Sequence, residues 1–254
     1  MIFALMTKRR KDDYVNLFEG LKRAFEEEGL RCHPESFMLD YESATWGAIR
    51  TCFPDATLTG CGFHWAKCLM GKWKELGLRA RAGENNLLCV IYRRTQAMRH
   101  LHEHQINRLF DAIKITAQGF PEDHKVHDYL GYIESQWIRS AVFPPSTWCQ
   151  YGIPLRSNND LEGWHRAFNV RVRNRPTFYL FVQRVYSEMV DTRNTIRSGD
   201  FQRRNNSQTI RHNEALATLW RRFHETDGQQ PWDLVDGIAR IFGYKGGVYT
   251  NREE

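Results

Sequence analysis

The feature that most constrains the fold is an alternation of short apolar runs with helical periods near the start of the chain. Three apolar runs have the length of buried strands: residues 2–6, 36–39 and 57–60. Between them, apolar residues recur at helical spacing over 14–25 and 42–53, and a further helix is expected over 64–76. The order β-α-β-α-β is typical of an α/β fold with a mostly parallel sheet and crossover helices.

The rest of the chain has helical periods and no clear strand. Helices are expected over 85–100, 104–116, 123–140, from Asn158, from Pro176 to Ile196, and over 208–223 and 232–242. We therefore predict four segments: 1–66 as an α/β core, 67–156 as a helical insertion, 157–200 as helices that complete the core, and 201–254 as a helical C-terminal tail.

Arginine is concentrated in the second half of the chain. The 254 residues carry 36 Lys and Arg against 30 Asp and Glu, a net charge of +6, yet residues 166–222 alone hold twelve Arg, four acids and no Lys. Guanidinium groups bind two phosphate oxygens at once, so this block favours a nucleic-acid partner. The alternative is an Arg-rich helical face that is simply solvated.

Other classes of protein are disfavoured by the sequence. No apolar stretch approaches the roughly 18 residues that a membrane span needs, and the apolar run before Lys8 is too short for a secretory signal. The six Cys include no Cys-x-x-Cys pair, so a disulfide scaffold is not expected. These features predict an intracellular protein that does not enter the membrane.

Two acidic residues stand where chemistry is often found. Asp40 directly follows an expected parallel strand, although an Asp there also commonly caps the next helix. Glu162 lies in the string Ser157–His165, in the first turn of a helix that Asn158 or Asn159 can cap. Its alternative interpretation is an exposed acid on a capped helix.

Several Cys and His residues could bind a metal. Cys61 and His64, with Cys68 four residues later, offer zinc ligands, but no second half of a zinc site follows at the usual spacing. Structural zinc is therefore not expected there. His100, His102 and His104 alternate in a segment with helical character, and we interpret them as surface histidines.

Three short sequence motifs, taken together and in order, resemble those of the catalytic domain of Mutator-like (MULE) transposases, and the resemblance covers roughly residues 2–200. The strings that carry the resemblance are Asp40-Tyr-Glu42, Gly60-Cys61-Gly-Phe-His64, and Asn158-Asn159-Asp-Leu-Glu162-Gly-Trp164-His165. Each string is weak alone, but their combination and spacing are specific.

The resemblance implies a ribonuclease-H-like fold with an Asp-Asp-Glu triad that binds Mg²⁺ or Mn²⁺. Asp40 corresponds to the second acid and Glu162 to the third, and Cys61 and His64 to a Cys-x-x-His signature. Two divalent ions about 3.5–4 Å apart could then activate the attacking oxygen and stabilise the leaving oxygen in DNA cleavage and strand transfer. A nuclear location, DNA as partner and a homo-oligomer are further expectations.

One departure from the family bears on activity. The first Asp of the triad belongs to the family's first strand, whereas this sequence begins at what corresponds to the third. We therefore expect an N-terminally truncated, partial ribonuclease-H-like core that does not catalyse strand transfer by itself. The alternatives are a transposase-derived DNA-binding or interaction protein and a product without present activity. The candidate DNA contacts are Arg166, Arg171, Arg173 and Arg175.

Overall fold

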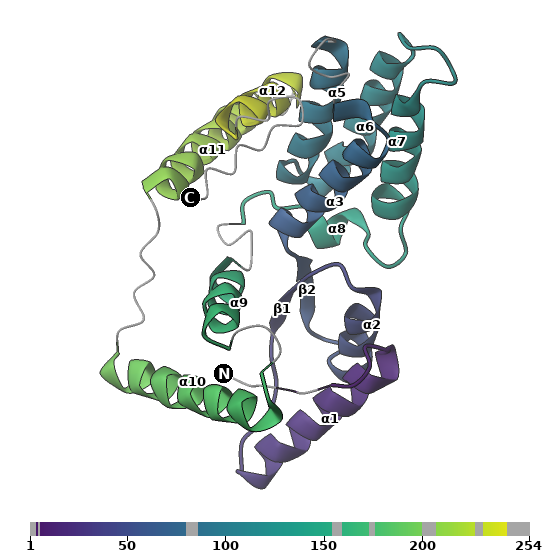
Figure 1. The fold of residues 1–254 in the computed structure, drawn as a ribbon. Coiled ribbons are helices and arrows are strands. Elements are labelled where there is room, and N and C mark those ends of the chain that lie inside the picture. Colours follow the sequence, from purple (N-terminus) through teal and green to yellow (C-terminus); the bar gives the residue numbers. More distant parts are fainter. Residues whose placement is uncertain are drawn as a thin grey trace.

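The computed structural model (Figure 1) describes residues 4, 6–79, 86–153, 159–172, 176–199, 207–226 and 231–242. Within them lies a parallel pair of strands, β1 (Ser36–Leu39) and β2 (Thr57–Gly60), and the other regular elements are helices. The chain is therefore α/β with helices predominating, as predicted. The expected strand at 2–6 lies largely outside the described residues, so the ribonuclease-H-like core stays a prediction.

The helix before β1 and the helix between β1 and β2 form one small core with the strands. Helix α1 (Lys11–Glu27) is followed by Gly29, whose φ of +69° lets the backbone turn so that the Leu30 amide donates to the Phe25 carbonyl at 2.8 Å. Helix α2 (Ser43–Cys52) packs on α1, and the aromatic rings of Phe18, Phe37 and Phe53 meet between helices and sheet. This core fixes the β1–α2–β2 unit.

Helix α3 (Gly62–Glu75) continues from β2 into the helical part of the molecule (Figure 1). The remaining described helices are α5 (Asn86–Ala97), the 3-10 turn η1 (Met98–His100), α6 (Glu103–Ala117), α7 (Lys125–Ile133), the π-helix η2 (Glu134–Ile138), α8 (Pro145–Trp148), α9 (Asn159–Val172), α10 (Phe178–Ser198), α11 (Ser207–Glu225) and α12 (Pro231–Ile241). They confirm the predicted helical segments, except that the one expected over 123–140 changes to a π-helix after Ile133.

The main hydrophobic core joins α3 to the helices that follow it. Trp65, Leu69 and Trp73 of α3 are fully buried against aromatic residues of α5 to α8. Helices α11 and α12 contribute to the same core, and Arg94 of α5 forms an ion pair with Asp236 of α12 at 3.1 Å. The C-terminal helices thus pack on the helical body.

One residue prediction is wrong: His100 is not a surface histidine. It is fully buried, its ring stacks on Phe242 with centroids 4.8 Å apart, and its carbonyl accepts a 2.9 Å hydrogen bond from Trp220 Nε1. The docking of α11 and α12 covers it, and these long-range contacts cannot be inferred from local periodicity. His104, by contrast, is exposed and His102 is half-buried.

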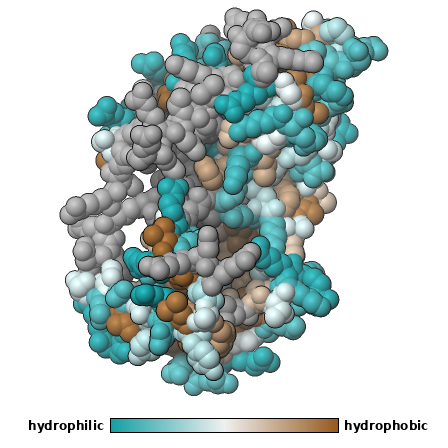
Figure 2. Space-filling view, in the orientation of Figure 1, coloured by the Kyte–Doolittle hydropathy of each residue, from teal (hydrophilic) through white to brown (hydrophobic). Residues whose placement is uncertain are grey.

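Helix α10 has an unusual distribution of side chains. Its apolar residues are largely exposed in the isolated chain, including Phe178 at 65% and Tyr186 at 66%, while Glu188 is buried. Figure 2 shows hydrophobic side chains on the face of the molecule over α9 and α10. None of the described helices is both long and apolar enough to cross a membrane.

Candidate functional site

Asp40 stands at the carboxyl end of β1, where parallel sheets commonly present functional groups. Its backbone is fixed because Trp46 Nε1, from the buried face of α2, donates a 2.7 Å hydrogen bond to the Asp40 carbonyl. Its side chain is 53% exposed. The fold thus holds the main chain of Asp40 rigidly while its carboxylate faces solvent.

Cys61 and His64 lie beside Asp40 because β2 runs parallel to β1 and ends at the same edge. The Cys61 amide donates to the Leu39 carbonyl at 2.7 Å, and the adjacent helix α3 brings His64 Nδ1 to 2.9 Å from Asp40 Oδ1. The ligand atoms of Asp40, Cys61 and His64 all lie within 4.8 Å of one another. The structure therefore brings Asp40, Cys61 and His64 together at one edge of the sheet.

The turn between β2 and α3 is held from the helical part of the chain. Arg99 of η1, which is 7% exposed, donates through Nη1 to the Gly62 carbonyl. The side-chain Nε2 of the fully buried Gln150 lies 3.5 Å from the Gly60 carbonyl, and the backbone N–H of Gln150 donates to the Arg99 carbonyl at 2.6 Å. These two residues fix the backbone on both sides of Cys61.

Sequence reasoning missed Arg99 and Gln150. Gln150 reaches a partner 90 positions away and Arg99 one 37 positions away, so no local motif connects them to the turn. The indirect signal is the pair Gly60 and Gly62. A side chain at Gly60 would collide with the ring of Tyr41, and one at Gly62 with the Gln150 amide.

Glu42, the other acid near Asp40, is directed toward α1. Its Oε2 accepts hydrogen bonds from the Tyr14 hydroxyl at 2.9 Å and from Thr45 Oγ1 at 3.2 Å. Glu42 therefore links the start of α2 to α1 and is not a member of the Asp40 group.

The backbone of Glu162 lies in the first turn of α9, as predicted, but its side chain is outside the described residues. Asn158 and the side chain of Asn159 are also outside them. The proximity of Asp40 and Glu162 therefore stays a prediction.

Two signature residues further along α9 have described side chains. Trp164 Nε1 donates to Glu188 Oε2 of α10 at 3.1 Å, and His165 is exposed. Trp164 thus contributes to the packing of α9 against α10.

The four candidate DNA-binding arginines differ in their surroundings. Arg166 is exposed, whereas Arg171 forms an ion pair through Nη1 with Glu188. The Arg171 side chain is still 53% exposed, so part of its guanidinium faces solvent. Arg173 and Arg175 lie outside the described residues.

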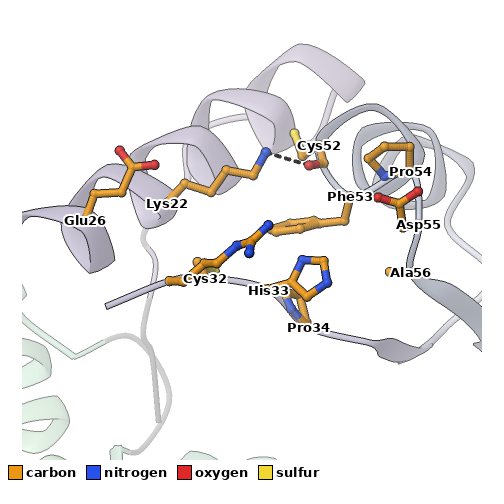
Figure 3. A pocket seen from close by; sticks show the side chains of 11 residues that line it. Lys22, Glu26, Cys32, His33, Pro34, Cys52, Phe53, Pro54, Asp55 and Ala56 are labelled. Atoms are coloured by element: carbon orange, nitrogen blue, oxygen red, sulfur yellow. Dashed lines mark hydrogen bonds between the residues drawn. The ribbon is translucent and has the colours of Figure 1, made fainter. Parts of the chain in front are cut away.

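A separate pocket of about 230 Å³ lies at the opposite ends of the strands, away from Asp40 (Figure 3). Lys22 of α1 lies at its edge, with Nζ 2.5 Å from the Cys52 carbonyl and 4.8 Å from the centre of the Phe53 ring. Basic and acidic side chains both line it: Lys22, Arg31 and His33 with Glu26 and Asp55. Because charges of both signs line this pocket, it gives no clear indication of a ligand.

The segment that contains the two strands matches a known protein family. Residues 1–68 match the MULE transposase domain. The match covers about a quarter of the chain and contains β1, β2, Asp40, Cys61 and His64. It confirms the resemblance to MULE transposases for this segment, while Glu162 and the arginine block lie beyond it. Comparisons with curated proteins and with solved structures found no match.

Proposed function

We propose that the chain is a transposase-family protein in which Asp40 and Glu162 bind the divalent ion used for DNA cleavage and strand transfer. The observation that carries the proposal is the position of Asp40: within the MULE match, at a parallel-strand end, with His64 Nδ1 2.9 Å from its carboxylate. DNA is accordingly the proposed partner.

The residues at this edge fit a hydrated Mg²⁺ or Mn²⁺ ion in part. Mg²⁺ prefers carboxylate oxygens and keeps several waters, and the half-exposed Asp40 carboxylate offers such a ligand. Cys61 is a soft, fully buried thiol and does not suit Mg²⁺. When bound, the ion would polarise the reacting phosphodiester, while His64 would hold and orient the Asp40 carboxylate.

We further propose that a polypeptide of these 254 residues is catalytically inactive by itself. Two-metal chemistry needs enough fixed carboxylate oxygens to hold both ions at a set separation. Among the described residues, the group around Asp40 contains one carboxylate, and Glu42 is engaged with Tyr14 and Thr45. Glu162 would add a second carboxylate, whereas the family resemblance implies a triad.

Metal binding and cleavage test these proposals separately. Titration with Mn²⁺ should give weak binding that Asp40→Asn and Glu162→Gln each reduce. Asp55→Asn, which changes an exposed acid at the other end of the sheet, should leave it unchanged. Equal Mn²⁺ binding by all four proteins would refute the site. Metal-dependent nicking of duplex DNA by the wild-type chain, abolished in Glu162→Gln, would refute the proposed inactivity.

The second candidate function is non-enzymatic DNA binding through the arginine block. The concentration of Arg in residues 166–222 favours it. Each phosphate contact contributes about −0.9 to the slope of log K against log salt, so replacing Arg166, Arg171, Arg173 and Arg175 with Gln should flatten the slope. Four exposed arginines outside the block serve as the control set: Arg9, Arg23, Arg31 and Arg108. Equal slopes for the two quadruple variants would show that the block is only a solvated face.

Three further expectations belong to the same proposal. We propose that the protein acts in the nucleus, where its DNA substrate would be. We also propose that it forms a homo-oligomer and that Cys61 and His64 do not hold structural zinc. Metal analysis that finds one zinc per chain, lost in Cys61→Ser, would contradict the last point.

A further inference from the structure

Three histidines and a tyrosine from separate parts of the chain gather at the junction of α6 and α11. His102 precedes α6, His104 lies in its first turn, Tyr151 follows α8 and His224 lies in the last turn of α11. The centroid of the His102 ring lies 5.1 Å from the ring centroid of His104, 6.1 Å from that of His224 and 3.7 Å from that of Tyr151. We call this group the histidine cluster.

We propose that the histidine cluster binds a divalent transition-metal ion of the zinc type, independently of the proposed DNA chemistry. Neutral imidazole is the commonest protein ligand for such ions. With Zn–N bonds of about 2.0–2.1 Å, two imidazoles on one tetrahedral ion have ring centres roughly 5 Å apart. The observed separations are 5.1 Å for His102 and His104, whose rings are stacked at an interplanar angle of 29°, and 6.1 Å for His102 and His224. The rings must therefore turn for their nitrogens to meet at one ion.

Side-chain rotation is what would bring the ring nitrogens to a common ion. His104 and His224 are exposed, and the torsion that turns an imidazole about its Cβ–Cγ bond has a broad energy minimum. The same exposure provides an entry path for the ion. His224 Nε2 contacts the Tyr151 hydroxyl, so the ion would use His224 Nδ1 or displace this contact.

His102 precedes α6 and His224 lies in the last turn of α11, so an ion held by both would lie between segments far apart in the sequence. The bound ion would connect the start of α6 to the end of α11 and so fasten the C-terminal helices to the helical body.

Calorimetric titration of the tag-free 254-residue chain with ZnCl₂ at pH 7.5 tests the proposal. We expect one binding event that His102→Ala and His224→Ala each weaken at least about ten-fold. His127→Ala removes a histidine of α7 outside the cluster and should bind like the wild type. Cys61→Ser disables the Asp40–Cys61–His64 group, the other place where zinc could bind, and should also leave the event intact.

Several outcomes would overturn the proposal: no binding by the wild type, full affinity in both cluster variants, or loss of the event in Cys61→Ser alone. If His102→Ala fails to fold, His104→Gln and His224→Gln replace it, because both change exposed side chains. Unchanged affinity in these two variants would equally refute the site. Zinc should also raise the thermal midpoint of the wild type and not that of the cluster variants.

Discussion

A methyl group added at Gly62 tests whether the helical part of the chain holds the turn beside Asp40. Gly62 begins α3, and a Cβ built there lies 2.5 Å from Nε2 and 2.7 Å from Cδ of Gln150, which is fully buried. Contacts this short do not occur between real atoms, so the Gln150 amide or the turn must move. The Gln150 amide also lies against the Gly60 carbonyl.

The size of the effect follows from two costs and one gain. Overpacking in a buried site costs about 1–3 kcal/mol, and disturbing a buried polar contact costs about 1–3 kcal/mol. Alanine in place of glycine in a helix gains up to about 1 kcal/mol. We expect Gly62→Ala to lower the free energy of unfolding by about 2 kcal/mol, and hence the thermal midpoint by roughly 4–8 °C.

The matched control is Gly71→Ala in the middle of the same helix. Nothing lies within 4 Å of a Cβ at Gly71, so this substitution should stabilise the protein by about 0.5–1 kcal/mol. Urea unfolding followed by circular dichroism measures both variants. A double-mutant cycle with Gln150→Ala should show the double variant less destabilised than the sum of the single ones. If Gly62→Ala is as stable as Gly71→Ala, Gln150 does not hold the β2–α3 turn.

Three further predictions concern stability and assembly. Arg171→Gln leaves the buried Glu188 without its ion-pair partner, so it should lower the free energy of unfolding, measured in urea, by about 1 kcal/mol. The control Arg193→Gln, on the exposed side of α10, should change this free energy by less than about 0.5 kcal/mol. Trp46→Phe removes the donor to the Asp40 carbonyl and should cost about 1 kcal/mol in the same assay, with an unchanged value as the refuting result. Sedimentation velocity should reveal a concentration-dependent homo-oligomer, and a monomer at all concentrations would refute it.

Local patterns in the sequence predicted local structure well. The helical spacing of Phe18 and Phe25, followed by Gly29, predicted α1 and its end, and the positive φ at Gly29 gives the physical reason. The apolar runs at 36–39 and 57–60 coincide with β1 and β2, and their pairing is parallel as predicted. The helix, its end and the individual strands depend on residues within a few positions of one another, and the parallel pairing follows from the β-α-β order of these elements.

Features that depend on distant residues could not be predicted in the same way. His100 is buried only because α11 and α12 return to cover it, with Trp220 bonded to its carbonyl from 120 positions away. Helix α10 shows the reverse, since its apolar periodicity predicts a buried face that is exposed in the isolated chain. A hydrophobic period shows which residues share a face of a helix, but it does not show what covers that face.

The contacts of Arg99 and Gln150 with the β2–α3 turn also bear on whether the matched segment can fold by itself. The MULE match ends at residue 68, within α3, and Trp65 of that helix is fully buried against Trp148, which lies outside the match. Arg99 and Gln150, which fix the turn around Cys61, are likewise contributed by the helical segment beyond it. The described part of the matched segment has a small core of its own, in which Ile49, Cys52 and Phe53 are the buried members, and a chain of this size is marginal in stability. The helical segment is therefore part of the structure that positions Asp40, Cys61 and His64, because without it both the buried face of α3 and the turn would be exposed to water.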